Sequence, residues 1–149
     1  MRLSGVFQLV GVSVMASLLA AGCSSSPTTP STDAPSIAVF SKTDVKVGTG
    51  AEATSTSTVT VNYTGWFFDA SKTDKKGLQF DTSYGRTPFI VQLGAGGIIE
   101  GWEQGVPGMR VGGQRRLVIP PSLGYGPNRV GLIPPNATLV FDIDLLEVK

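Results

Sequence analysis

The segment from Leu139 to Leu145 places apolar side chains at alternate positions. Leu139, Phe141, Ile143 and Leu145 form one set, and Asp142 and Asp144 stand between its last three members. Successive side chains of a strand point to opposite faces, so this pattern predicts a half-buried strand. The apolar face of such a strand must be covered, which requires a sheet with further elements packed on one side.

The same alternation recurs elsewhere and predicts the rest of that sheet. Expected strands cover residues 58–63, 88–93 and 116–119, with edge strands at 43–47 and 78–80. One stretch has helical spacing instead, with Ile98, Ile99, Trp102 and Val106 three or four residues apart after Gly96-Gly97. A helix of this length is unstable alone, so its apolar stripe must pack on the sheet. The sequence predicts an α+β fold: a curved antiparallel β-sheet, or half-barrel, wrapped around one short α-helix.

Composition excludes several classes of function. The chain has no histidine and one cysteine, which rules out Ser-His-Asp and Cys-His hydrolysis and a thiolate or imidazole metal site. If Arg2 is removed with a leader, 11 basic residues face 11 acidic ones. A neutral chain without a basic patch does not favour a nucleic-acid partner. We expect no metal and no cofactor.

The first residues predict export. Residues 1–22 join Arg2 to an apolar run that is shorter than the ~20 residues of a membrane span, and they end in small residues, as signal peptides do. Residues 19–23, Leu-Ala-Ala-Gly-Cys, resemble the bacterial lipobox, although Leu19 lies one place earlier than that motif usually has leucine. The resemblance implies fatty acylation at Cys23 and anchoring to a bacterial membrane on its periplasmic or cell-surface side. An ordinary secretory leader with an incidental cysteine is the alternative.

A tether and one folded domain are expected after the leader. Residues 24–36 are almost wholly Ser, Thr and Pro, a composition that buries too little apolar surface to fold. The predicted organisation is therefore a signal peptide at 1–22, a Cys-anchored Ser/Thr/Pro-rich linker at 23–40 and a domain at 41–149.

From Lys42 to Lys149 the motifs resemble the FKBP family of peptidyl-prolyl cis/trans isomerases. They are, in order, Tyr-Thr-Gly at 63–65, Phe-Asp-Thr-Ser at 80–83, Pro-Phe at 88–89, Ile-Ile-Glu-Gly-Trp-Glu-Gln-Gly-Val at 98–106, Tyr-Gly at 125–126 and Ile-Pro-Pro-Asn-Ala-Thr-Leu-Val-Phe-Asp at 133–142. The ordered combination is far more specific than any one piece. It implies an FKBP-like fold with an apolar cleft for proline-containing polypeptides, macrocyclic inhibitors as further ligands, and a monomeric state.

The resemblance also implies the site residues. Those expected to be catalytic are Tyr63, Asp81, Phe89, Ile99, Trp102, Tyr125 and Phe141. Those expected to bind substrate are Phe80, Arg86, Ile98, Leu132 and Ile133. Trp102 would form the floor of the cleft. Three departures from minimal members stand out: a longer loop at 67–79, a shorter one at 127–131, and Gly97 in place of a side chain near the ligand.

Isomerisation suits this residue set because no bond breaks and no proton moves. Rotation about an X-Pro amide is opposed by ~18–20 kcal/mol of resonance, which is lost in the twisted transition state. An apolar cleft favours that less polar state over the hydrated planar amide. Asp81 poses a difficulty, because strict alternation after Phe80 would point it to the opposite face. A strand end or a bulge is required there.

Two other functions stay open from the residues. A set of Phe, Ile and Trp at strand and helix spacing is more often plain core than a site. The chain could be a peptide-binding module or chaperone with little turnover, or, less in keeping with the motifs, a small-ligand β-barrel.

Overall fold

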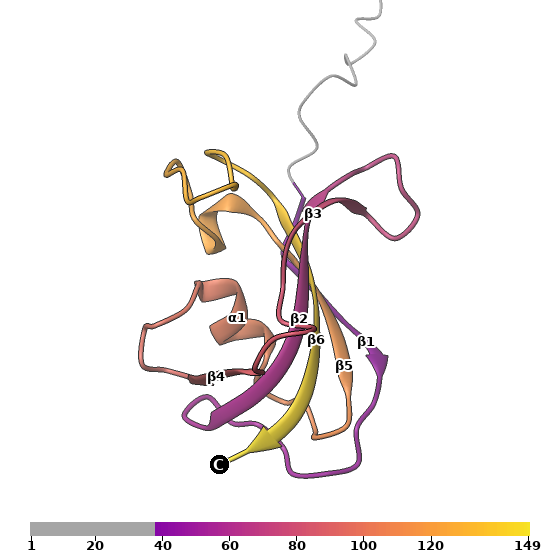
Figure 1. The fold of residues 1–149 in the computed structure, drawn as a ribbon, viewed down its shortest axis with the longest axis vertical. Coiled ribbons are helices and arrows are strands. Elements are labelled where there is room, and N and C mark those ends of the chain that lie inside the picture. The colour runs from indigo at the N-terminus through magenta and orange to yellow at the C-terminus, as the bar shows by residue number, and fades with distance from the viewer. Residues whose placement is uncertain (1–37) are drawn as a thin grey trace, which may run out of the picture. The chain divides into compact units, whose positions relative to one another are not determined.

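The computed structural model describes residues 38–149, which fold into one sheet with a short helix on its concave face (Figure 1). The predicted leader, Cys23 and most of the linker lie outside these residues. The strands are β1 (Ser41–Lys46), β2 (Thr58–Phe68), β3 (Lys76–Thr82), β4 (Phe89–Gln92), β5 (Gln114–Ile119) and β6 (Leu139–Val148). Helix α1 (Glu100–Gly105) lies between β4 and β5, and a 3-10 turn covers Pro121–Leu123.

All strand pairs are antiparallel, in the order β1-β5-β6-β2-β3, with β4 also paired to β2. Strand β2 is longer than the predicted 58–63 because β6 pairs with it from Val59 to Phe67. Its other edge is shared by β4 at one end and β3 at the other. The predicted fold class, a curved antiparallel sheet with a short helix, is confirmed.

Helix α1 is shorter than the expected 98–106. Ile99 is its N-cap residue and has extended dihedrals, φ −63° and ψ 146°, so the helix begins only at Glu100. No side chain caps this end. Two glycines set the distance between α1 and β5, because a Cβ on Gly101 would lie 2.5 Å from Ile119 and one on Gly105 would lie 2.5 Å from Leu117. The helix therefore rests directly on the sheet.

The core fills the space between α1 and the concave face. Its fully buried members come from the alternating positions of the central strands: Val59, Val61, Leu117, Ile119, Leu139, Ile143 and Leu145. Val106, just after α1, and Trp102 within it complete the core from the helix side. Within residues 38–149, no helix has the length and apolar character that crossing a bilayer demands.

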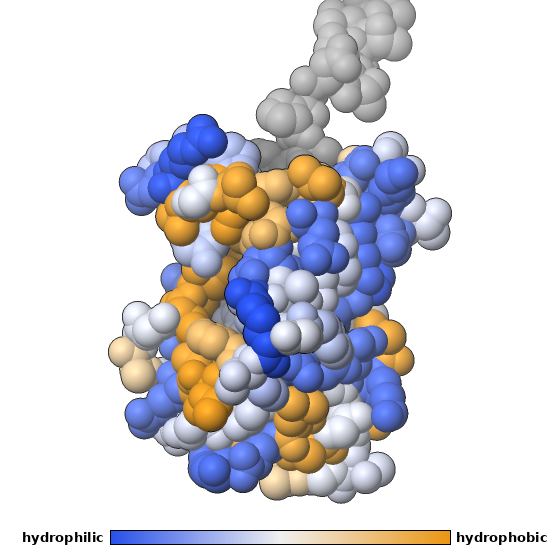
Figure 2. Space-filling model, viewed as in Figure 1, coloured by the Kyte–Doolittle hydropathy of each residue, from blue (hydrophilic) through white to orange (hydrophobic). Residues whose placement is uncertain are grey.

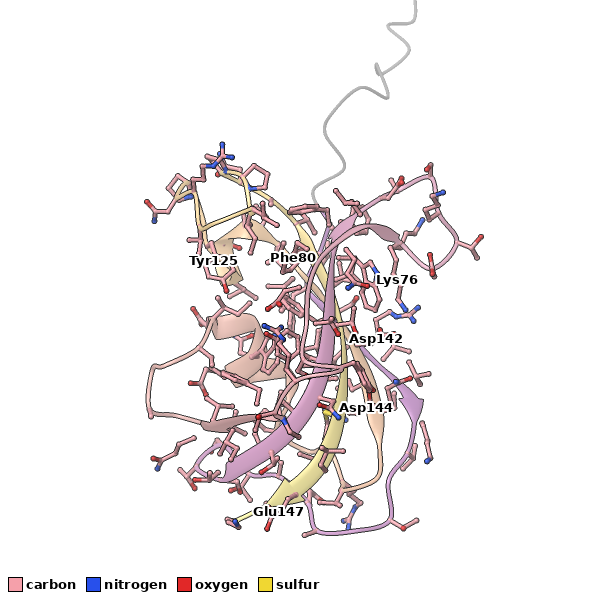
Figure 3. The ribbon with its side chains drawn as sticks, in the orientation of Figure 1. Lys76, Phe80, Tyr125, Asp142, Asp144 and Glu147 are labelled. Carbon is pink, nitrogen blue, oxygen red and sulfur yellow. The ribbon has the colours of Figure 1, made fainter. Side chains whose placement is uncertain are left out.

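The opposite face of the sheet is held by polar contacts. Asp142 of β6 accepts two hydrogen bonds from Arg116 at 2.7 and 3.0 Å and one from Lys76 at 2.6 Å. The Lys76 ammonium also lies 4.1 Å from the centre of the Trp66 ring. Burial would raise the pKa of Asp142, but the bonds from its two basic partners outweigh burial and lower it. Figure 3 shows Lys76 and Asp142 on the side of the sheet away from Tyr125.

Candidate active site

A cleft of about 660 Å³ opens between α1, the loop before it and the loop that follows the 3-10 turn. The space-filling view shows apolar surface around a hollow in this region (Figure 2). The structure brings almost all of the predicted site residues to this cleft: Tyr63, Phe80, Asp81, Phe89, Ile98, Ile99, Trp102, Tyr125, Leu132, Ile133 and Phe141. Arg86 is the exception, since it does not line the cleft.

Four aromatic rings form the base of the cleft. The Trp102 ring is 5.4 Å from that of Tyr63, 5.5 Å from that of Phe141 and 6.1 Å from that of Phe89, with interplanar angles between 82° and 86°. Edge-to-face contacts of this kind stabilise aromatic clusters beyond simple burial. Trp102 is 4% exposed and closes the bottom, whereas Phe89 is 39% exposed at the rim. The result is a rigid apolar floor.

Gly65 of β2 makes room for the wall beside that floor. A Cβ at this position would lie 2.6 Å from the Phe80 ring and 2.8 Å from the Phe141 ring. The two rings meet edge to face over the glycine, with their centroids 5.6 Å apart. A larger residue at 65 would push both rings into the cleft.

A bulge in β3 resolves the difficulty posed by Asp81. Gly65 pairs with Asp81, while the next residue of β2, Trp66, pairs with Gln79, so Phe80 is left without a partner. An extra residue on one strand breaks the alternation of side chains locally. Phe80 and Asp81 therefore both reach the cleft although they are adjacent in sequence.

The Asp81 carboxylate is held by three donors. One oxygen accepts a bond from the Tyr63 hydroxyl at 2.5 Å, and the other accepts bonds from the Thr82 N–H at 2.8 Å and from Arg86 at 2.5 Å. Burial would raise the pKa of Asp81, but these bonds outweigh it and leave the pKa below its usual value. Burial and the bond to Asp81 raise the pKa of Tyr63 to about 12. At neutral pH the pair is a carboxylate and a neutral phenol.

Arg86 acts on the cleft from outside. Its N–H donates to the Ser83 carbonyl at 3.0 Å, and its guanidinium bonds the Thr82 carbonyl as well as Asp81. Gly85, with φ of +82°, supplies the left-handed residue of this turn. The arginine thus fixes the orientation of Asp81 without touching the space where a ligand would lie.

Comparison with known proteins decides the family. The sequence profile of FKBP-type peptidyl-prolyl cis-trans isomerases matches residues 50–146. The chain belongs to this family. An FK506-binding protein of Neisseria meningitidis is 43% identical over 107 residues, covering 70% of this chain and 92% of that protein. The FK506-binding protein 1 of Aspergillus oryzae is 42% identical over 106 residues, covering 68% of this chain and 91% of that protein.

Solved structures agree with the fold of this FKBP. FkpA from Escherichia coli superposes with a TM-score of 0.63 at 41% identity, over 74% of this chain and 48% of FkpA. AtFKBP13 gives a TM-score of 0.62 at 35% identity, over 74% of this chain and 93% of AtFKBP13. The chain therefore spans about half the length of FkpA. The predicted family and enzyme class, peptidyl-prolyl cis-trans isomerase, are confirmed.

Besides the buried indole N–H of Trp102, two polar groups of the FKBP cleft lack partners within the described residues. The Ile99 N–H donates to no backbone carbonyl within residues 38–149. The Tyr125 hydroxyl lines the cleft, and its pKa is raised by burial and by the charge of Asp81 rather than by a hydrogen bond. Both groups are therefore available to donate to a ligand. Figure 3 places Tyr125 on the α1 side of the sheet.

Some lining residues were not among the predicted site residues, although Gly97 was noted as a position near the ligand. The cleft also includes Gly96, Gly97, Glu100, Gly124 and Val130. Glycines carry no side chain for a periodic pattern to register, and Glu100 falls on the polar side of the helical stripe. The Gly96-Gly97 pair, two residues before the start of the helix at Glu100, was the available signal, because it marks backbone that approaches a ligand without a wall of side chains.

Proposed function

We propose that this protein accelerates X-Pro rotation in exported polypeptides by non-covalent binding in its aromatic cleft. Support comes from family membership together with the grouping of Tyr63, Phe89, Trp102 and Phe141 around one apolar floor. When a prolyl ring is buried there, the amide next to it loses the water that stabilises its planar, polar form. The twisted transition state has less resonance and less carbonyl polarity, so losing water costs the transition state less free energy than it costs the planar ground state.

Different residues have different roles in the proposed mechanism. Trp102, Phe89, Ile99 and Phe141 hold the prolyl ring. The Ile99 N–H and the Tyr125 hydroxyl donate hydrogen bonds to substrate carbonyls, which fixes the peptide while its amide turns. Asp81 presents a fixed negative charge beside the rotating amide. No proton transfer is needed at any step.

A matched pair of tyrosine variants tests the proposal in a proline-limited refolding assay. Tyr125→Phe removes a hydroxyl that has no protein partner, so we expect unchanged stability and about a tenfold loss of kcat/KM, equivalent to ~1.4 kcal/mol. Tyr84→Phe removes a hydroxyl that donates to Asp144 at 2.5 Å on the outer face, so it should lower stability and spare turnover. Equal activity in wild type and Tyr125→Phe contradicts the role of this hydroxyl.

Loss of the cleft itself separates turnover from binding. Phe141→Ala and Asp81→Val, in variants shown by circular dichroism to be folded, should lose rate enhancement, with Asp69→Val in the exposed β2–β3 loop as the control. Binding of an unfolded proline-containing client with no rate enhancement in the wild type would instead favour a peptide-binding module or chaperone. Because relatives carry the name FK506-binding protein, we also propose that FK506 occupies the cleft and inhibits turnover.

We further propose that the protein is exported and lipid-anchored through Cys23. The lipobox-like residues 19–23 and the Ser/Thr/Pro-rich residues that follow support this proposal. Cells labelled with a radioactive fatty acid should incorporate label into the membrane fraction of the wild type and not into Cys23→Ser. Label that persists in Cys23→Ser, or no label at all, contradicts anchoring at this residue.

A further inference from the structure

Two charged residues line the cleft, and they differ in how their charge is balanced. Asp81 receives bonds from a phenol, an amide N–H and the Arg86 guanidinium, so its charge is compensated by an ion pair. Glu100 receives one bond, at 2.9 Å, from the neutral side-chain amide of Gln104. It takes part in none of the ion pairs within residues 38–149. Glu100 is thus the uncompensated charge of the cleft lining.

The approach to Glu100 is open. It is an exposed residue at the start of α1, and Gly96 and Gly97 line the same part of the wall. A Cβ added to either glycine would meet no atom within 4 Å. The two glycines thus leave open space on this side of the cleft for a substrate side chain. Glu100 lines the same cleft and carries the charge that such a side chain would meet.

The loop at residues 127–131 carries a positive charge that could offset that of Glu100. Arg129 precedes Val130, which lines the cleft, but Arg129 itself is exposed and does not line it. Its charge lies in solvent beyond the lining, where it is screened over about 8 Å at physiological ionic strength. Glu100 lines the cleft and Arg129 does not, so Glu100 is the charged residue to weigh first for a bound peptide.

We infer that Glu100 determines substrate specificity by favouring polypeptides with Lys or Arg beside the isomerised proline. The inference rests on the proposed isomerase function and adds the charge class of its substrates. An ion pair with an exposed carboxylate is weak, so the expected preference in kcat/KM for a lysine peptide over its glutamine counterpart is about two- to fivefold. The preference should fall toward one as salt rises, because exposed charges are screened.

The test compares peptides that differ only in the residue before the proline, or only in the residue after it, as Lys, Gln or Glu. The full chain should favour Lys over Gln over Glu in at least one of the two series at low salt. Glu100→Gln should bring the Lys to Gln ratio to about one, and Glu100→Lys should reverse it. Glu147→Gln, at the far end of β6 (Figure 3), is the matched control and should keep the ratio.

Three results overturn the inference: a wild-type ratio near one in both series, a ratio that Glu100→Gln leaves intact, or a ratio abolished by Arg129→Gln alone. These outcomes are distinct from failure of the proposed function. If no peptide is turned over at all, the isomerase proposal fails; if the glutamine peptides are turned over without any charge preference, only the role of Glu100 fails.

Discussion

Replacing Gly101 with alanine tests how closely α1 must approach the sheet for the cleft floor to form. The new Cβ would lie 2.5, 2.7 and 2.8 Å from three carbon atoms of Ile119, whereas unstrained carbon contacts lie near 3.5–4.0 Å. Ile119 is fully buried, so it has no free space into which to turn. The helix must therefore move by about 1 Å, and Trp102 is the next residue of that helix.

Two opposing contributions decide whether this substitution stabilises or destabilises the protein. Alanine gains up to ~1 kcal/mol over glycine inside a helix, and less in a first turn. Overpacking a dense core costs about 1–3 kcal/mol. We expect a net loss of about 1–2 kcal/mol, which lowers Tm by roughly 4–8 °C for a domain of this size. Displacing the cleft floor should also reduce kcat/KM by ~10-fold or more.

Gly97→Ala is the matched control for stability. An added Cβ at 97 meets nothing within 4 Å, and the backbone there does not need a positive φ. The same chemical change should therefore leave the stability of the protein unchanged or raise it by about 0.4–1 kcal/mol, because alanine lowers the conformational entropy of the unfolded chain. Urea unfolding of both variants, with the refolding assay alongside, gives the comparison. A Gly101→Ala protein as stable and as active as the wild type refutes the close-packing argument.

Three further predictions concern titratable groups. Asp142→Asn leaves two partly buried cations without their partner and should cost about 2–4 kcal/mol at pH 7 in urea unfolding. The folded pKa of Asp142 is lowered, so its contribution is complete above the unfolded value of 3.8 and is lost as pH falls through the folded pKa. As the pH falls below ~4, the variant should therefore lose less stability than the wild type does. Equal losses of stability in the two proteins would contradict the contribution of ionised Asp142. In ultraviolet phenolate titration, Tyr63→Phe should remove a group titrating near pH 12. Asp81→Asn should lower the pKa of Tyr63 but keep it above 10, because burial contributes more to the raised pKa than Asp81 does. For a neutral peptide we expect kcat/KM to be constant from about pH 6 to 9, because Asp81 stays ionised and Tyr63 stays neutral over this range. A bell-shaped pH profile would argue for proton transfer.

Local patterns in the sequence predicted the fold because its central strands bury one face each. The alternation in β6 and in the first half of β2 reports that burial directly. The ends of the strands and of the helix were harder to predict from the sequence, because they depend on which segments pair and pack in the folded structure. Lys76 and Gly77 have no strand-like pattern, yet pairing of Lys76 with Phe68 includes them in β3. Ile98 and Ile99 fit the helical stripe, yet the helix starts after them.

The site was predictable where a motif matched the family and less so where geometry depends on an irregularity. Alternation alone assigns Phe80 and Asp81 to opposite faces, and only the cross-strand register reveals the bulge that brings both to the cleft. Arg86 was expected to bind substrate, but in the structure it supports Asp81 from outside the cleft. The catalytic roles of the other residues remain predictions that the variants above address.

The charge states of the cleft connect its structure to its chemistry. Hydrogen bonds keep Asp81 ionised and burial keeps Tyr63 and Tyr125 neutral, so none of these three groups changes its charge near neutral pH. A reaction that needs a proton relay would be poorly served by such groups. Rotation about an amide needs none, and in the proposed mechanism the fixed carboxylate beside the aromatic floor acts on the amide only through its field and the exclusion of water. The bulge in β3, the turn at Gly85 and the close-packed helix thus keep constant the environment in which we propose that the prolyl bond twists.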